Sequence, residues 1–453
     1  MPTLLASTGG KRVLLLNPPV AEVAEAQDAW ASIRTPPFAL LRLAGWLRGL
    51  GAEVALLDAL SDPALEGRPK GRRRGRLRCG EDGDAPVERD VFHYGLDAPL
   101  LEQRLADFSP DVIAVSATFT WHAPVVEEVV AACRRAHPRA KVVLGGNFPS
   151  LCPDVARRAG ADETFVGDVP DAAFSPTAVD LLVRPPEADW LRLVKGCPNR
   201  CSYCVAPALS GGRVTFRSPD AVVAELKEKV ARHGVRRFAF HDDAILYRRA
   251  ELVEPLLDRI AREVQGVFID FGSGIAAWQV DDALARRLRA AGVQVVHLAL
   301  ETLDPVRSRE MHRPQGREQF ERAVEILKAH GYRGPSLRAF YLVGMPDQTT
   351  DEILEALLWL YRLGVTPHLT AYTLTPGSED HARYRDRVTD RALEELAPLA
   401  WRFASPRMRV RDLDGCLRYF SERFYPLERI LGSRTDDPLV RRMQELAAQG
   451  AGT

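Results

Sequence analysis

Short runs of consecutive apolar residues alternate along the chain with longer segments in which apolar residues recur every three or four positions. Five such runs occupy the N-terminal part: RVLLLN (12–17), EVALLD (53–58), DVIAVSA (111–117), KVVLGG (141–146) and ETFVGD (163–168). Segments of helical period, such as FALLRLAGWLRGL and PVVEEVVAACRRA, lie between them. Continuous apolar strands alternating with helices are typical of a parallel sheet covered on both faces. We therefore expect a doubly wound, Rossmann-like α/β domain over residues 1–168, which would bind ligands at the carboxyl ends of its strands.

A connector rich in proline and aspartate, residues 169–189, precedes a second series. Its six runs are LRLVKG (191–196), RRFAFHDD (236–243), GVFIDFG (266–272), QVVHLALE (294–301), SLRAFYLVG (336–344) and PHLTAYTL (367–374). Ser218, before a proline, and Thr349 are expected to cap helices that lie between these strands. Six βα units fall short of the eight of a full barrel, so residues 190–380 predict a partial (β/α)6, TIM-like barrel.

Residues 381–453 are expected to form a helical C-terminal segment. Its aromatic residues would pack in a core or, as the alternative, form a lid over a substrate: Trp401, Phe403, Tyr419, Phe420 and Phe424.

Composition narrows the class of protein. The chain has 453 residues, of which 61 are basic and 61 acidic, so its balanced charge gives no global attraction to nucleic acid or to an anionic membrane. The N-terminus shows no basic region of a signal peptide, and no apolar run reaches the length of a membrane span, so a cytoplasmic location without a membrane partner is expected. Seven cysteines, an odd number, favour reduced thiols or metal ligands over a disulfide framework.

One segment departs from the charge balance. Residues 66–86, EGRPKGRRRGRLRCGEDGDAP, hold seven basic side chains and several glycines. We interpret them as a solvated flexible loop rather than a patch that contacts phosphate or nucleic acid, because no aromatic residues alternate with the arginines. No nucleic-acid partner is expected.

Three cysteines, Cys197, Cys201 and Cys204, directly follow the first strand of the predicted barrel, at the face where barrel active sites lie. A structural zinc site normally takes four ligands, often as two Cys-x2-Cys pairs, and no second pair lies nearby in the sequence. Three thiolates on a 4Fe-4S cluster leave one iron without a protein ligand. The motif therefore indicates a cluster with an open iron, which is itself a binding site.

The Cys-x3-Cys-x2-Cys spacing, with Tyr203 just before its last cysteine, resembles the signature of the radical S-adenosylmethionine (AdoMet) superfamily over about residues 190–380. The resemblance implies that AdoMet chelates the open iron through its amino and carboxylate groups. It also implies an external electron donor, such as a flavodoxin or ferredoxin. The reduced cluster would cleave AdoMet to methionine and a 5′-deoxyadenosyl radical that abstracts hydrogen from an unactivated carbon.

Other positions of that family can be carried over one at a time. The second strand is followed by HDD in place of a glycine-rich acidic motif, so the resemblance assigns the methionine amino group to Asp242 or Asp243. Ser273, in FGSG, is a candidate contact of the methionine carboxylate. Gly344, in YLVGMP, occupies the position where the family's backbone approaches adenine.

Glu301 ends the fourth strand at the position that resembles the family's ribose contact. Strand parity places it inside the barrel, because the alternate apolar set Val296, Leu298 and Leu300 faces the helices. Three side chains on inward positions of the last two strands are candidates for lining a substrate cavity: Arg338, His368 and Tyr372. We expect Glu301, Asp242 and Tyr372 to be the catalytic residues.

The N-terminal domain resembles the cobalamin-binding domain found in one large group of radical AdoMet enzymes, through VLLLNPP, PDVIAVSATFT, KVVLGGNFPSL and ADETFVGD in that order. The candidate cobalamin contacts are polar residues and glycines at strand ends: Asn17, Ser116, Thr118, Gly145, Gly146 and Gly167. No D-x-H-x-x-G motif follows the first strand, so no histidine is offered as the lower ligand of cobalt. The alternative is a domain retained only as a scaffold.

These features favour a cobalamin-dependent radical methyltransferase that acts on an unactivated carbon, or on phosphorus, of a small molecule or peptide. The alternative enzyme is a radical rearrangement or cyclisation catalyst on the same scaffold. A methylthiotransferase would need a second cluster on three N-terminal cysteines, and Cys79, Cys133 and Cys152 do not follow the first strand as such a cluster requires. A non-enzymatic cobalamin sensor is disfavoured, because it has no use for a cluster motif beside Asp242 and Glu301.

Overall fold

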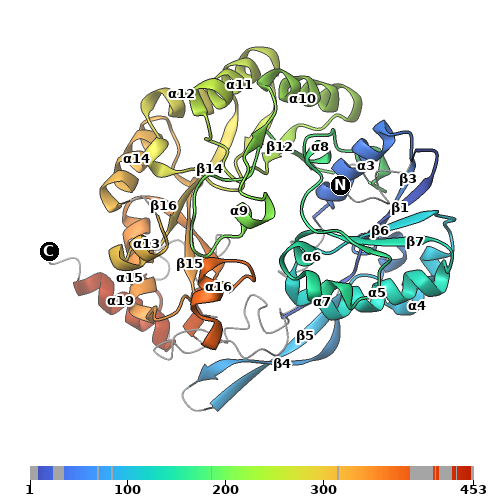
Figure 1. Ribbon diagram of the computed structural model, residues 1–453. Helices are drawn as coiled ribbons and strands as arrows, with labels where there is room; N and C mark the ends of the chain where they lie inside the picture. The colour runs from blue at the N-terminus through green and yellow to red at the C-terminus, as the bar shows by residue number, and fades with distance from the viewer. Residues whose placement is uncertain are drawn as a thin grey trace.

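Two α/β units lie side by side in the computed structural model, one blue to teal and one green to orange in Figure 1. The structure describes residues 9–23, 35–68, 71–82, 85–184, 186–313, 316–387, 412–413, 415–417, 431–434 and 436–449, and omits the side chains of 78–82 and 170. The aromatic residues that sequence places in the C-terminal segment, Trp401 to Phe424, lie outside the described residues.

The first unit is a five-stranded parallel sheet in the order β3-β1-β6-β7-β8. Its strands are β1 (Arg12–Asn17), β3 (Glu53–Asp58), β6 (Val112–Ser116), β7 (Lys141–Gly145) and β8 (Glu163–Thr164). Its helices are α3 (Phe38–Gly49), α4 (Ala98–Leu105), α5 (Ala123–Ala136), α6 (Asn147–Leu151), α7 (Pro153–Arg157) and α8 (Pro170–Ala173). Alternate residues of β1 pack on opposite faces, Leu14 and Leu16 toward α4 and α5, Val13 and Leu15 toward α3. The doubly wound domain predicted from sequence is thereby confirmed.

The basic segment is not a loop, which corrects the expectation from sequence. Residues Arg72–Asp82 form β4, which pairs antiparallel with β5 (Ala85–Tyr94), and β2 (Val20–Glu22) completes a three-stranded sheet. In Figure 1 this hairpin extends below the first unit. Two of its arginines pair with acidic side chains, Arg73 with Asp90 of β5 and Arg74 with Glu128 of α5. Cross-strand pairs such as Arg73–Asp90 stabilise a strand that lacks apolar alternation.

The second unit is a six-stranded parallel sheet in the order β16-β15-β14-β13-β12-β9, the partial barrel that sequence predicts. Its first strand is Ala188–Leu191 and not the predicted run 191–196, because Val194–Lys195 of that run pair antiparallel with Thr215–Phe216 in a separate two-stranded sheet. Its strands are β9 (Ala188–Leu191), β12 (Arg237–Phe240), β13 (Phe268–Asp270), β14 (Val293–Glu301), β15 (Gly334–Val343) and β16 (Val365–Ala371). Its helices are α10 (Pro219–His233), α11 (Arg249–Glu263), α12 (Asp282–Ala290), α13 (Pro305–Glu310), α14 (Arg317–Ala329) and α15 (Thr350–Arg362). Ser218 and Thr349 cap α10 and α15, as predicted. Beyond the barrel lie α16 (Glu379–Arg383) and α19 (Pro438–Gln449), and α19 packs on α15.

A network of buried charges joins the two units. Arg42 of α3 donates hydrogen bonds to the carbonyl oxygens of Ser175 (2.5 Å) and Trp190 (2.9 Å) and lies 3.6 Å from a carboxylate oxygen of Glu225 in α10. Lys229 bridges Glu225 and Asp189, each at 2.7 Å. These side chains are almost fully buried, so the opposite charges must be paired for the interface to persist. The network holds the first unit in one position against the barrel.

Candidate functional site

The three cysteines of the motif lie in the loop between β10 (Val194–Lys195) and α9 (Ala206–Leu209). Each sulfur accepts a hydrogen bond from nitrogen. Cys197 accepts one from the backbone of Asn199, Cys204 one from the backbone of Ala206 at 3.5 Å, and Cys201 one from Arg313 Nη1 at 3.6 Å. Burial raises the pKa of Cys197, and that of Cys204 to about 11, and the backbone hydrogen bonds oppose this rise. Donors of this kind also tune the potential of an iron–sulfur cluster.

Among the described residues, no group of three or more His, Cys, Asp or Glu side chains gathers closely enough to hold a single metal ion. A four-iron cluster does not need such convergence, because each cysteine binds a different iron atom. Three thiols in one loop, each with its own donor, therefore fit a cluster better than a mononuclear site.

The cluster loop has a fixed backbone. Gly196 has φ +88°, and a Cβ added there would lie 2.1 Å from the carbonyl oxygen of Arg213, beside β11 (Thr215–Phe216). Asp243 accepts a hydrogen bond from the Gly196 amide at 2.6 Å. Only glycine fits this position, and the aspartate after β12 fixes where the loop begins.

Asp242 also serves the backbone, and its expected role as a catalytic and AdoMet-binding residue stays a prediction. Its Oδ1 accepts hydrogen bonds from the amides of Leu193 (2.9 Å) and Val194. Its Oδ2 is shielded from solvent and has no hydrogen-bond partner among the described residues. Burial raises the pKa of Asp242 to about 7. A carboxylate enclosed in this way holds the strand that leads to the cysteines and offers no exposed oxygen to a ligand.

Glu301 lies at the end of β14 with φ +70°, in a left-handed conformation that is rare for this residue type. The register between β14 and β15 shifts beside it. Burial raises the pKa of Glu301, whereas the charge of Arg313 and a hydrogen bond from the Tyr203 hydroxyl lower it. Strain of this kind persists only where surrounding contacts impose it, and it is common at functional sites. The contact with Tyr203 places Glu301 next to the cluster loop.

Arg313 is a site residue that sequence analysis missed. Its Nη2 donates to the carbonyl oxygen of Ala299 at 2.9 Å, and its Cζ lies 5.9 Å from the ring centroid of Trp278. Burial alone would lower its pKa, but the charges of Tyr203, Glu301 and Cys201 raise it above the usual range. Its buried Nε has no hydrogen-bond partner among the described residues. A cation with a spare donor beside the cluster loop suits a carboxylate ligand.

The other two candidate AdoMet contacts lie in turns at the same end of the barrel. Ser273 is exposed in the turn after β13. Gly344 is buried after β15 with φ +84°, and its amide donates to Gln348 Oε1 at 2.9 Å. Gln348, which sequence analysis also missed, is fully buried and returns a hydrogen bond to Leu342. This side chain fixes the YLVGMP turn.

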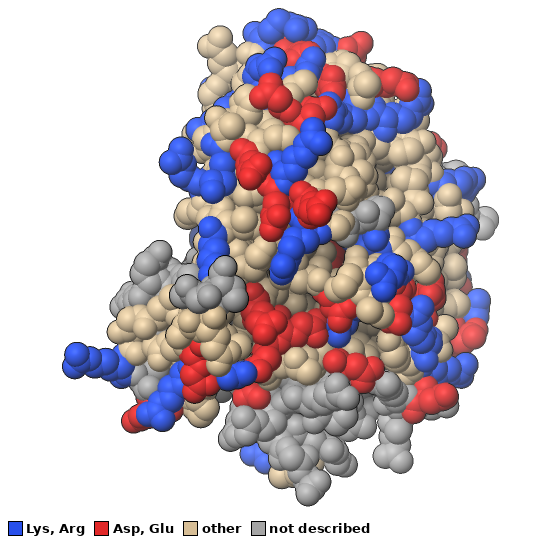
Figure 2. Space-filling view, turned by 90° about the vertical axis from the view of Figure 1, so that its left-hand side faces the viewer, with Lys and Arg blue, Asp and Glu red and all other residues tan. Residues whose placement is uncertain are grey.

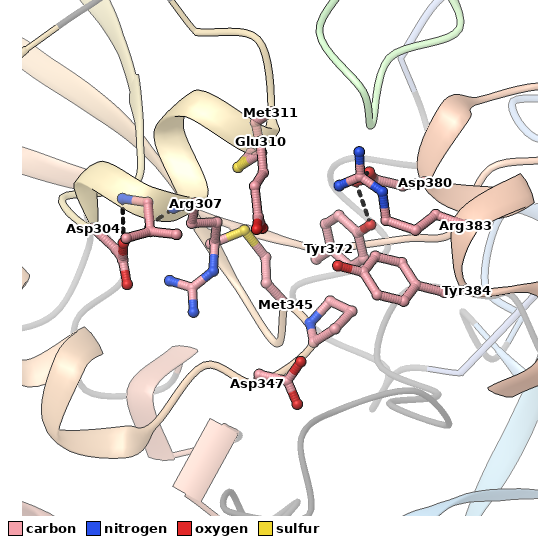
Figure 3. A pocket seen from close by; sticks show the side chains of 12 residues that line it. Asp304, Arg307, Glu310, Met311, Met345, Asp347, Tyr372, Asp380, Arg383 and Tyr384 are labelled. Atoms are coloured by element: carbon pink, nitrogen blue, oxygen red, sulfur yellow. Dashed lines mark hydrogen bonds and ion pairs between the residues drawn. The ribbon is translucent and has the colours of Figure 1, made fainter.

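Tyr372 lines a cavity of ≈ 220 Å³ near α13 and α16. Figure 3 shows Tyr372, Asp380 and Tyr384 on one side of it and Asp304 and Arg307 on the other. The Tyr372 hydroxyl donates to Asp380 Oδ2 at 2.6 Å, and burial raises its pKa. The phenol is therefore committed to a carboxylate, and its predicted catalytic role stays a prediction. Arg338 likewise donates to the carbonyl oxygen of Pro335.

All six candidate cobalamin contacts lie at the carboxyl edge of the first sheet, and their surroundings differ. A Cβ on Gly146 would lie 2.4 Å from the carbonyl oxygen of Ala117, so this glycine lets two loops pack together, and its contact with cobalamin stays a prediction. A Cβ on Gly167 would meet nothing within 4 Å. Asn17 donates to Asp58 at 2.7 Å. The remaining three, Ser116, Thr118 and Gly145, are partly or fully exposed there.

This edge faces the cluster loop. Helix α6, which follows β7, contacts α9, and Figure 1 shows α9 in the space between the two units. Lys195 Nζ lies 2.9 Å from Asp168 Oδ2, which joins the strand before the cysteines to the loop after β8. A cavity of ≈ 270 Å³ lies here between Gly167, Asp168 and the segment around α9. The exposed strand ends of the first unit thus open toward the cysteine loop.

A parallel barrel with a three-cysteine loop, joined at its carboxyl end to a doubly wound domain, defines a class of radical enzymes with two cofactor sites. Family comparison agrees: the radical SAM superfamily matches residues 191–381, and the B12 binding domain matches residues 84–174. The chain therefore carries a B12-binding domain followed by a radical SAM domain. These two domains imply a 4Fe-4S cluster, AdoMet and cobalamin as its cofactors.

The curated relatives are distant. The ribosomal protein uS12 methylthiotransferase RimO of Pelobacter propionicus is 26% identical over 286 residues, which are 58% of this chain and 59% of that protein. RimO of a Nostoc species is 23% identical, over 70% of this chain and 69% of its own length.

Two solved structures share the fold. The radical AdoMet methyltransferase TsrM of Kitasatospora setae, with cobalamin and a 4Fe-4S cluster bound, has a TM-score of 0.64 at 16% identity and covers 98% of this chain and 99% of its own. The cobalamin-dependent radical enzyme OxsB has a TM-score of 0.55 at 13% identity and covers 98% of this chain and 62% of its own. The resemblance extends over both units of the chain.

Two of the cysteines outside the motif, Cys133 and Cys152, lie in or between helices of the first unit. Cys133 is fully buried within α5, where burial raises its pKa to about 12, and Cys152 lies between α6 and α7 with a pKa raised to about 11. The side chain of Cys79 lies outside the described residues.

On the face shown in Figure 2, basic and acidic side chains are interspersed. None of the described helices has the length and apolar character of a membrane span.

Proposed function

We propose that the protein is a cobalamin-dependent radical methyltransferase that acts on an unactivated carbon or on phosphorus in a small molecule or peptide. One observation carries the proposal: the carboxyl edge of the B12-binding domain faces the cysteine loop, with α6 against α9 and Lys195 paired with Asp168. When bound, AdoMet on the cluster supplies a radical that removes hydrogen, and cobalamin supplies a methyl group. A substrate between the units would be within reach of both.

The chain's own residues would bind and orient the cofactors. The three motif cysteines hold the cluster, and Asp242 and Asp243 fix the backbone from which they project. Glu301 would accept a hydrogen bond from a ribose hydroxyl of AdoMet, and Tyr203 and Arg313 hold that carboxylate in place. The buried Arg313 Nε, together with Ser273, would bind the methionine carboxylate. The backbone at Gly344 approaches adenine, supported by Gln348.

The products derived from AdoMet test the proposal. Methyl transfer through cobalamin uses AdoMet twice, once as radical source and once as methyl donor, so a substrate that turns over should yield 5′-deoxyadenosine and S-adenosylhomocysteine in nearly equal amounts. Glu301→Ala should reduce deoxyadenosine formation, because the ribose loses its acceptor. Formation of deoxyadenosine without substrate-dependent S-adenosylhomocysteine, in cobalamin-loaded protein, would instead establish the rearrangement or cyclisation alternative.

A further inference from the structure

An aromatic side chain is exposed at the centre of the carboxyl edge of the first sheet. Phe119 follows β6, and 44% of its surface is accessible. Its ring is stacked on that of Trp121, with the centroids 4.6 Å apart and the planes 16° from parallel. Because Trp121 covers one face of the phenyl ring, the accessible area belongs to the other face and to the ring edge. The chain therefore presents a flat apolar surface at this position.

The ring beneath Phe119 is firmly held. Trp121 Nε1 donates to Glu22 Oε1 at 3.3 Å. It also packs against Val23, and against Leu77 and Val91 of the β4–β5 hairpin. The hairpin and β2 thus support Trp121 from behind. A supported aromatic stack loses little conformational freedom when a ligand packs on it, which favours binding.

Phe119 is linked to the cysteine loop through a short series of packed elements. Strand β6 is central in the sheet, and the 3-10 turn η2 (Thr120–His122) that follows Phe119 contacts α6, which contacts α9 of the cluster loop. Strands β6 and β8 are two strand spacings apart, about 10 Å. Phe119 and the unobstructed Gly167 therefore follow strands two spacings apart at the same edge of the sheet.

We propose that the ring of Phe119 lies beneath the cobalt and supports the lower face of the corrin, so that no nitrogen ligand reaches the metal from that side. A flat ring offset-stacked on a conjugated macrocycle gains dispersion and excludes water. The nearest histidine along the chain, His122, is buried and held by Glu22 Oε1 at 2.7 Å. The proposal rests on cobalamin binding, and it holds whether the enzyme methylates or rearranges its substrate.

Cobalamin affinity and the spectrum of Co(II) test the proposal without substrate. We would compare wild type, Phe119→Ala and Phe119→His with the matched pair Phe268→Ala and Phe268→His, because Phe268 is similarly exposed (49%) at the start of a barrel strand. Binding of hydroxocobalamin would be measured by equilibrium dialysis, and cob(II)alamin-loaded protein by electron paramagnetic resonance. Thermal melting would establish that each variant is folded.

The expected results are specific to Phe119. Phe119→Ala should weaken cobalamin binding by about tenfold or more. Phe119→His should introduce nitrogen superhyperfine splitting on Co(II), which wild type and Phe268→His lack. Wild-type affinity in Phe119→Ala, or no nitrogen coupling in folded Phe119→His, would overturn the proposal. If wild-type protein bound no cobalamin, the cofactor assignment itself would be contradicted. Failure of that assignment can thus be distinguished from failure of the role proposed for Phe119.

Discussion

The guanidinium of Arg313 lies against the sulfur of Cys201, with Nη1 3.6 Å from Sγ. A cationic donor stabilises the more negative, reduced state of an iron–sulfur cluster. Arg313→Gln should therefore lower the midpoint potential of the cluster, by on the order of 40 mV if about 1 kcal/mol of charge-assisted bonding is lost. A redox titration followed by electron paramagnetic resonance measures the shift.

A matched control for this variant is Arg317→Gln, because Arg317 lies over the Trp359 ring and not against a motif cysteine. Its cluster potential should equal that of wild type. Equal potentials in Arg313→Gln and wild type would show that Arg313 does not act on the cluster.

Iron content should depend on the three motif cysteines alone. Protein reconstituted without oxygen should hold about four irons, and the triple alanine variant of Cys197, Cys201 and Cys204 should hold none. Alanine variants of Cys133 and Cys416, both fully buried away from the motif, should keep the full complement. Iron assay and the visible absorption of the cluster distinguish these cases, and a cluster that survives in the triple variant would refute the assignment.

Two glycines at the edge of the first sheet should differ in their sensitivity to a methyl group. Gly146→Ala would bring Cβ to 2.4 Å from a backbone oxygen, so the free energy of unfolding should fall by about 3 kcal/mol or more. In Gly167→Ala the added Cβ meets no atom within 4 Å, and only the backbone φ of +99° disfavours alanine. The free energy of unfolding should therefore fall by about 1 kcal/mol. Denaturant unfolding of the two variants measures both decreases. Equal decreases in the free energy of unfolding would contradict the prediction.

Asp242 should make the stability of the protein depend on pH. Its pKa in the fold, about 7, exceeds the usual value near 4, so the folded state binds more protons than the unfolded state between these values. The contribution of Asp242 to stability therefore falls as the pH rises from about 4 to about 7. Asp242→Asn keeps an oxygen for the Leu193 and Val194 amides and cannot ionise.

The melting temperature of Asp242→Asn should accordingly decline less than that of wild type between pH 5 and pH 8. Parallel curves for the two proteins would mean that Asp242 is ionised throughout this range and that its enclosure does not disfavour the charge.

Sequence patterns predicted the elements whose physics is local. Strands buried on both faces must be apolar throughout, so runs such as RVLLLN gave β1 with the same bounds, and the hydroxyl of Ser218 marked the start of α10. The cysteine loop was evident because three ligands within eight residues have few structural explanations. Strand parity also predicted Glu301 inside the barrel; the structure has this residue buried, and a shift of register between Ala299 and Glu301 interrupts the alternation on which that prediction rested.

The features that sequence missed depend on contacts between distant segments. Arg313 reaches Cys201 across 112 residues, and no periodicity indicates such an approach. The arginines of β4 suggested a solvated loop because their acidic partners, among them Asp90 and Glu128, lie on other elements. Asp242 was assigned to a ligand because the backbone amides it binds belong to the neighbouring strand.

The buried network of Arg42, Glu225, Lys229 and Asp189 couples the two units through one side chain, because Arg42 belongs to α3 and the other three residues belong to the barrel unit. A substitution that removes the Glu225 carboxylate would leave buried cations of both units without their shared counter-charge, and breaking a buried pair in this way costs about 3–5 kcal/mol. The free energy that docks one unit on the other therefore depends on a residue outside the cysteine loop. A mutation there would loosen the two cofactor sites relative to each other without touching either.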